Sequence, residues 1–291
     1  MGAYLGVICA LSPDDRGRRE WYCLLCLRWC SPCPRQEPGR TKGTTATSQQ
    51  TPTIKVVANP SKGDGMPESV QETVRTHLDH GRACLDKGKY DDAIADYDKA
   101  IALDPNVALA YTNRGLAYGR KGWVDRAIAD FSKAIALDPN VARAYTNRGK
   151  AYYSKGKVDH AIADHTRAIA LNPNVAVVYY NRGLAYAKKG NYDRAIADYD
   201  KAIALDPNVA RAYTIRGLAY ARNGEVDRAI ADYTKAIALD PKLAFAYFNR
   251  GVAYEKKGDK EQAIADFRKA LEINPISTRA KACLKRLGVT P

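Results

Sequence analysis

A line of 34 residues recurs along most of this chain. Residues 176–209 read AVVYYNRGLAYAKKGNYDRAIADYDKAIALDPNV, and the proline near the end of that line returns every 34 positions. The six prolines are Pro105, Pro139, Pro173, Pro207, Pro241 and Pro275. A fixed internal period of about 20–50 residues is typical of stacked repeats, in which each copy contacts only its neighbours. We therefore expect one elongated repeat unit instead of the two globular domains that 291 residues would otherwise suggest.

Each copy carries the signals of two helices separated by a glycine. When each copy is numbered from 1 to 34, position 15 is always glycine, which can end a helix in the left-handed conformation. An acidic residue follows three places on and suits the positive end of a second helix, which ends at an Asp-Pro or Asn-Pro pair. The predicted helix-turn-helix copies are residues 74–107, 108–141, 142–175, 176–209, 210–243 and 244–277. Helical signals begin before them, at the capping-box pattern Ser69-Val-Gln-Glu72.

Small residues stand at the same positions in every copy. Position 8 is always glycine, and positions 20 and 27 are always alanine. A glycine inside a helix costs about 1 kcal/mol relative to alanine, so six in register need a packing reason. We expect the two helices of a copy to approach closely there, with aromatic side chains filling the space around them. In the fourth copy these aromatics, at positions 4, 11 and 24, are Tyr179, Tyr186 and Tyr199.

This combination of length, glycine, alanine, aromatic and proline positions resembles the tetratricopeptide repeat family over residues 74–277. The resemblance implies an all-α fold: a right-handed superhelical α-solenoid of six 34-residue helix-turn-helix repeats plus a C-terminal capping helix. The predicted repeat domain spans residues 66–291, with the capping helix at residues 278–288 covering the last repeat. In the sixth copy Phe245, Phe248 and Val252 either pack against this cap, which we favour, or form an anchor pocket for a partner.

Three departures from the family pattern concern polar residues. Position 4 is tyrosine where the family usually has tryptophan, and it is His77 in the first copy. Position 7, commonly leucine, is arginine in copies two to six, and position 23 is aspartate in all six. We predict a structural ladder between these residues, in which Asp130 meets Arg148. Position 24 of the third copy is His165, for which we predict a neutral form in the core.

Residues 1–65 do not share the repeat, and we predict a disordered, cysteine-containing segment followed by a linker. Residues 34–65 are rich in Pro, Gly, Thr and Ser. The preceding cysteines form a C-x2-C-x3-C-x2-C pattern beside tryptophans. Paired CxxC units can ligate zinc through thiolates, but only three residues separate these pairs where about a dozen or more are usual. The apolar neighbours are compatible with attachment to a membrane surface. We favour no specific role. The four cysteines are Cys23, Cys26, Cys30 and Cys33.

Charge and motifs narrow the classes of function. The net charge of +14 favours acidic partners, and no apolar run reaches the ~18 residues of a membrane span. The sequence has neither a phosphate-binding glycine loop nor an HExxH motif, so we expect no enzymatic activity, no catalytic residues, no cofactor and no metal ion.

We expect a cytoplasmic monomer or weak oligomer. Nucleic acid is a less favoured partner because the aromatics occupy core positions. A self-assembling structural spacer is the third hypothesis.

The resemblance implies a protein-interaction scaffold whose concave groove is lined by the first helix of each copy. Asparagine recurs at position 6, where its amide can pair with an extended peptide backbone. Basic residues at positions 2, 9 and 13 favour an acidic segment or a C-terminal carboxylate. Two windows approach the carboxylate clamp of related domains, although Ile215 stands in the second where that clamp has a cation. The first window is Arg82, Asn113, Arg143 and Asn147, and the second is Lys150, Asn181 and Arg211. The remaining predicted groove residues are Tyr180, Lys188 and Asn249.

Overall fold

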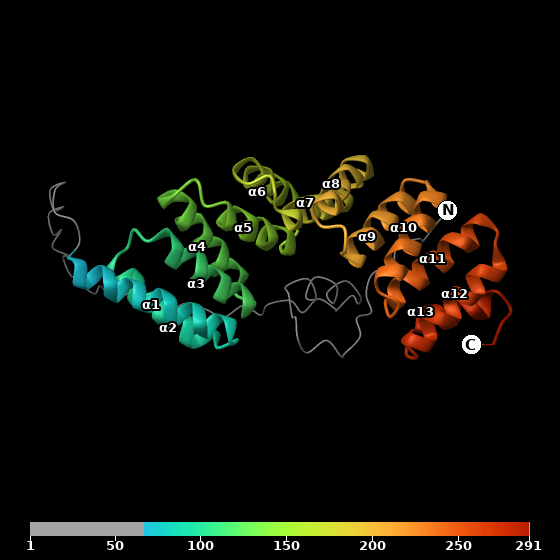
Figure 1. Ribbon diagram of the computed structural model, residues 1–291, viewed down its shortest axis with the longest axis horizontal. Coiled ribbons are helices and arrows are strands. Elements are labelled where there is room, and N and C mark those ends of the chain that lie inside the picture. Colours follow the sequence, from blue (N-terminus) through green and yellow to red (C-terminus); the bar gives the residue numbers. More distant parts are fainter. Residues whose placement is uncertain (1–66, 291) are drawn as a thin grey trace, which may run out of the picture.

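The computed structural model describes residues 67–290, within which the regular structure is entirely α-helical. The prediction for residues 1–65 lies outside the described residues. The helices form an arched row that runs from α1 and α2 at one end to α12 and α13 at the other (Figure 1). Their bounds are α1 Glu68–Asp86, α2 Tyr90–Leu103, α3 Ala108–Arg120, α4 Val124–Leu137, α5 Ala142–Ser154, α6 Val158–Leu171, α7 Ala176–Lys188, α8 Tyr192–Leu205, α9 Ala210–Arg222, α10 Val226–Leu239, α11 Ala244–Lys257, α12 Lys260–Ile273 and α13 Thr278–Arg286. The predicted all-α solenoid is confirmed, with α13 in the place of the capping helix.

The turn between the two helices of each copy depends on the glycine at position 15. All six of these glycines have positive φ, from 74° to 91°. In the second copy the Trp123 amide donates to the Tyr118 carbonyl at 2.9 Å, and the Gly122 amide to the Gly119 carbonyl at 3.0 Å. These bonds satisfy carbonyls at the helix end, and they require a residue that tolerates the left-handed conformation between them. The predicted chain reversal at this glycine is confirmed.

The first helix begins differently from the prediction. It starts at Glu68, one residue before Ser69, and Pro67 precedes it with no side-chain cap. The predicted capping box is therefore wrong, because Ser69 already lies inside the first turn. Proline is favoured at helix starts, since its fixed φ suits the helix and its missing amide hydrogen leaves one fewer donor to satisfy.

The two helices of each copy pack through the glycine at position 8. A Cβ built on Gly183 would lie 2.6 Å from Cε1 of Tyr199, which is fully buried, and the other five glycines meet the ring at position 24 of their copies in the same way. Real Cβ atoms do not approach so closely. The aromatic ring occupies the volume of the missing side chain, which explains the repeated glycine.

We expect Gly183→Ala to destabilise the protein by about 1–3 kcal/mol through overpacking, even though alanine is the better helix former. Gly119→Ala is the matched control, because the fourth and fifth copies already have alanine at its position, as Ala187 and Ala221. The control is expected to gain up to about 1 kcal/mol. Urea denaturation of both variants tests the contrast, and equal effects would contradict the packing role of Gly183.

The predicted arginine–aspartate ladder exists with different partners. Arg148 does not meet Asp130: its Nε and Nη2 each donate to Asp164 of the same copy at 2.8 Å. Positions 7 and 23 lie opposite each other on the two antiparallel helices of one copy, so the pair closes within that copy. The neighbouring copy is reached by Nη1, which donates to Ser132 at 3.1 Å. Position 25, and not position 23, therefore carries the link between copies.

The same arrangement recurs in copies two to six. Each arginine at position 7 donates two hydrogen bonds to the buried aspartate at position 23 of its copy and one to position 25 of the preceding copy. The within-copy pairs are Arg114–Asp130, Arg148–Asp164, Arg182–Asp198, Arg216–Asp232 and Arg250–Asp266. Hydrogen bonding to Asp130 raises the pKa of Arg114 well above its usual range. These guanidinium groups hold the fold together and are not available to a partner.

The last copy packs against α13. Phe248 shares a buried cluster with Ala280, Cys283 and Leu284 of that helix, as the favoured alternative predicts. Val252 remains 40% exposed. Arg286 of α13 also pairs with Glu255 of α11 at 2.6 Å. Within residues 67–290, none of the helices is both long and apolar enough to cross a membrane.

Candidate functional site

The first helices of the copies form the inner layer of the arch. Helix α3 contacts α1 and α5, α5 also contacts α7, and α9 contacts α11. In Figure 1, α5, α7 and α9 lie on the inner side of the row and α6, α8 and α10 on the outer side. The first helices therefore present a continuous surface along the inner side of the row.

Most of the predicted basic groove residues reach solvent. Arg82, Arg143, Arg211 and Lys188 are exposed, and Lys150 is half-buried. The Lys188 ammonium lies 4.8 Å from the centre of the Tyr153 ring on α5, so it spans two copies. Across positions 2, 5, 6, 9, 12 and 13, copies two to five contain no acidic residue. Their basic residues at these positions are Arg120, Arg143, Lys150, Lys188, Arg211 and Arg222.

Basic and apolar residues alternate at position 2. Leu109 is 50% exposed and Val177 36% exposed, with exposed Arg143 between them in the row and Arg211 after Val177. The full series is Arg75, Leu109, Arg143, Val177, Arg211 and Phe245. Sequence reasoning identified the arginines and missed Leu109 and Val177. The signal that could have found them is an apolar residue at a position where the neighbouring copies carry a charge.

The predicted asparagine ladder is more buried than the basic residues. Asn113, Asn181 and Asn249 are at most 5% exposed, and Asn147 is half-buried. Asn249 donates from Nδ2 to the Phe245 carbonyl of its own helix at 2.7 Å. Nδ2 of Asn181 is buried without a hydrogen-bond partner. Asn181 therefore keeps an amide donor that the described residues do not satisfy.

The two clamp-like windows are each spread over consecutive first helices. Arg82 lies on α1, Asn113 on α3, and Arg143 with Asn147 on α5. In the second window Lys150, Asn181 and Arg211 lie on α5, α7 and α9. Ile215, where the clamp has a cation, is half-buried and packs against the cluster around Tyr199. Tyr180 is half-buried at the junction of α7, α8 and α9, with its ring centre 5.8 Å from that of Tyr199.

Comparisons with known proteins agree with this architecture. Family models described as TPR repeat match residues 81–122, 123–156 and 149–190, and models described as tetratricopeptide repeat match residues 180–244 and 244–276. None of the curated proteins compared with the chain matches it significantly.

Two solved structures illustrate the similarity. The first is YrrB, described as a TPR protein with an unusual peptide-binding site. It is 27% identical, has a TM-score of 0.58, and the match covers 65% of this chain and 97% of that one. The second, MamA, is 35% identical with a TM-score of 0.53, over 55% of this chain and 94% of that one. Since the matching family models together span residues 81–276, the chain belongs to the tetratricopeptide repeat family.

Proposed function

We propose that this protein is a non-catalytic scaffold that binds an extended peptide with acidic and apolar side chains along its first helices. The observation that carries this proposal is the alternation at position 2. Exposed Arg143 and Arg211 are interleaved with exposed Leu109 and Val177. A peptide that follows the row of helices meets a cation and then an apolar side chain at successive copies.

Electrostatics favour an acidic partner. The position-7 arginines are neutralised by buried aspartates of their own copies. The inner-face positions 2, 5, 6, 9, 12 and 13 of copies two to five carry basic residues and contain no acidic residue, so the face is positive as a whole. Clustered charge of one sign attracts the opposite charge and raises the rate of association. The positive charge of this face is thus matched by carboxylates of a peptide.

Asn181 supports backbone recognition. Its Nδ2 has no acceptor within the described residues, and a buried amide without a partner costs about 1–3 kcal/mol. Because this nitrogen is buried, a peptide carbonyl beside Tyr180 would supply the acceptor only after the Asn181 side chain rotates outward. Tetratricopeptide repeat proteins mediate interactions with proteins and peptides, and YrrB is described as having a peptide-binding site.

The burial of the aromatic rings makes nucleic acid the weaker candidate. Single-stranded nucleic acid is bound by stacking of bases on exposed aromatic side chains. Here the rings at position 24 pack against the glycines, and Tyr111, Tyr179 and Tyr213 at position 4 are buried as well. A peptide does not require such stacking platforms.

The double variant Arg143→Glu/Arg211→Glu tests the proposal. The probe is a fluorescent peptide of alternating Glu and Leu residues, and its counterpart has Lys in place of Glu. We expect the wild type to bind the Glu peptide more tightly than the Lys peptide, with an affinity that falls as salt is added. The variant should lose roughly tenfold or more in affinity for the Glu peptide, which is about 1.4 kcal/mol. Fluorescence anisotropy measures the affinity of the wild type and of the variant for each peptide.

The matched control is Arg167→Glu/Lys201→Glu, which makes the same charge change at exposed residues of the second helices α6 and α8. This control should bind the Glu peptide nearly as well as the wild type. Equal losses in both double variants would show that net charge alone drives binding and would refute a site on the inner face. Preferential binding of single-stranded nucleic acid over the Glu peptide would favour the weaker candidate instead.

A further inference from the structure

The first copy departs from the other five at three positions that surround one aspartate. Position 4 is His77 where the others have tyrosine, position 7 is His80 where they have arginine, and position 11 is Cys84 where they again have tyrosine. The aspartate at position 23 is retained as Asp96. Two imidazoles and a thiol, which are common metal ligands, thus stand where copies two to six have the guanidinium and phenol groups near this aspartate.

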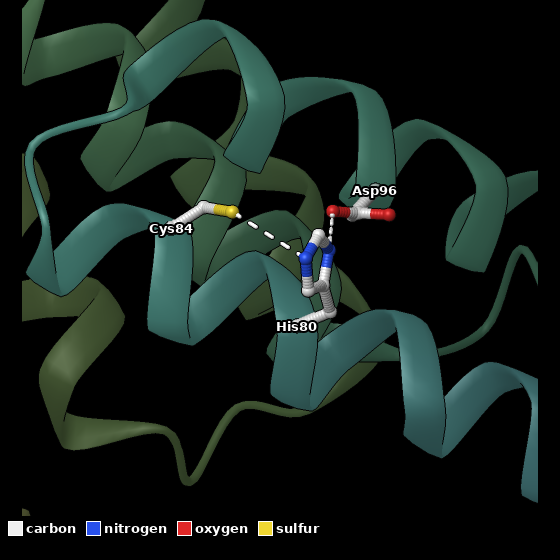
Figure 2. Close-up of side chains that lie close together, drawn as sticks. All are labelled: His80, Cys84 and Asp96. Atoms are coloured by element: carbon white, nitrogen blue, oxygen red, sulfur yellow. Dashed lines mark hydrogen bonds and ion pairs between the residues drawn. The ribbon is translucent and has the colours of Figure 1, made fainter.

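The structure brings these side chains together between α1 and α2. Figure 2 shows the His80 ring between the other two groups, with one nitrogen directed to Asp96 and the other to Cys84. Nδ1 of His80 lies 2.5 Å from Oδ2 of Asp96, and Nε2 lies 3.9 Å from the Cys84 sulfur. One ligand atom from each of the three residues can be chosen so that all lie within 4.8 Å of one another.

Asp96 is in direct contact with imidazoles where its counterparts are paired with a guanidinium, and Lys99 acts on it only at longer range. It is only 7% exposed, as buried as Asp130, Asp164 and the other aspartates at position 23. Those aspartates each face a guanidinium, which is always charged, whereas the groups that contact Asp96 are the imidazoles of His77 and His80. A divalent cation would supply the missing charge, since buried carboxylates are stabilised by a paired charge or a metal.

We propose that His80, Cys84 and Asp96 bind a divalent transition-metal ion such as Zn²⁺. A single ion binds only one imidazole nitrogen, so it would replace the hydrogen shared by His80 and Asp96 after these two groups move apart and side-chain rotation brings the Cys84 thiolate to the same side of the ring. A nitrogen, a sulfur and an oxygen ligand together suit Zn²⁺ and Co²⁺ and do not suit Mg²⁺ or Ca²⁺, which prefer oxygen.

The neighbouring groups fit this role. His77 lies 3.2 Å from Oδ1 of Asp96 through Nδ1, so it holds the carboxylate by the oxygen that His80 does not contact. Hydrogen bonds of this kind orient metal ligands and raise metal affinity. The His80 side chain is 65% exposed, which leaves a path for the ion and room for water as the fourth ligand.

The test uses the full chain with the cysteines of residues 1–33 replaced by serine, because the C-x2-C-x3-C-x2-C pattern is a competing source of thiolates. The replaced residues are Cys9, Cys23, Cys26, Cys30 and Cys33. Isothermal titration with Zn²⁺ should find one ion per chain in this background. Titration with Co²⁺ should produce the thiolate-to-cobalt absorption band in the near ultraviolet. A background chain that binds neither ion would overturn the proposal.

The variants restore the residues of the other copies, so each should keep the fold. His80→Arg recreates the arginine–aspartate pair and is expected to abolish Zn²⁺ binding, and Cys84→Tyr should do the same. His77→Tyr should weaken binding by about 10- to 100-fold, because it removes only a supporting hydrogen bond. Circular dichroism checks that each variant is helical. Cys84→Ser provides a smaller replacement in case the tyrosine does not fit beside His80.

The matched control is His160→Arg, which replaces another exposed histidine with the arginine found at that position in the second, fourth and fifth copies. It should leave Zn²⁺ affinity and the cobalt band unchanged. An unchanged affinity in His80→Arg, or a cobalt band that survives in Cys84→Ser, would show that the ion is held elsewhere and would overturn the site. Peptide binding at the inner face is measured separately and does not depend on this outcome.

Discussion

Replacing Arg182 by methionine is expected to lower the free energy of unfolding by about 3–5 kcal/mol. The guanidinium donates to Asp198 at 2.8 and 2.7 Å and to Thr166 of the preceding copy at 3.1 Å. Asp198 is 6% exposed, so its carboxylate would remain buried without a compensating charge. Methionine keeps much of the side-chain length, and the loss therefore reports the missing charge and donors. Urea denaturation followed by circular dichroism measures it.

Lys189→Met provides the control for an exposed ion pair. Lys189 pairs with Asp159 of the preceding copy, but the two side chains are 47% and 77% exposed. Its loss should cost less than about 1 kcal/mol. The double variant Arg182→Met/Asp198→Leu should recover part of the stability lost in Arg182→Met, because no buried charge is then left unpaired. Similar effects of Arg182→Met and Lys189→Met would contradict the role given to the buried pair.

The substitution His165→Phe is expected to stabilise the protein and to remove part of its acid sensitivity. His165 is fully buried, and neither ring nitrogen has a hydrogen-bond partner. Burial, with the nearby cations Lys150 and Arg182, lowers the pKa of His165 to about 3. Phenylalanine occupies the same position in the second and sixth copies, as Phe131 and Phe267. At pH 7 the gain should be about 1–3 kcal/mol, from removal of the unsatisfied polar atoms.

The direction of the pH effect follows from the lowered pKa. Between pH 6.5 and about 3 the unfolded chain protonates this histidine while the folded chain does not, so the wild type loses stability as the pH falls. Each pH unit in this window costs about 1.4 kcal/mol. The advantage of His165→Phe over the wild type should thus grow by about 2 kcal/mol between pH 6.5 and pH 4.5, because the unfolded histidine is only half protonated at pH 6.5. Urea denaturation at several pH values tests this, with exposed His160→Phe as the control. Parallel pH curves for wild type and His165→Phe would refute the argument.

Much of the fold could be predicted because its causes lie within one copy. The 34-residue period, the left-handed glycine at position 15 and the helix stop before the proline are local properties of the backbone. The glycine at position 8 implies close packing, and the structure identifies the ring that fills its place, such as Tyr199 against Gly183. The partners of the arginines could not be predicted, because Asp130 and Asp164 are equally plausible for Arg148 until the relative heights of the two helices are known.

The candidate sites also combine features that the sequence predicts with features that only the packing of the helices reveals. The basic residues of the inner face could be identified from position alone, since long charged side chains remain exposed on a helix. The burial of Asn113 and Asn181 could not, because burial depends on how neighbouring helices pack around a residue and not on its type. His80, Cys84 and Asp96 lie on two helices and match no linear motif, so only their contact reveals them as a group.

The sequence by itself therefore determined the repeat, the turns and the sign of charge on the inner face, because these depend on backbone sterics and residue type. Only the tertiary structure decided which charges neutralise one another and which polar groups remain without a partner. Those outcomes depend on distances of a few ångströms between helices, as the 2.8 Å bonds from Arg148 to Asp164 show. Hydrogen bonds and charge pairs weaken steeply with distance and exposure, so their energies are set by packing and not by the order of residues along the chain.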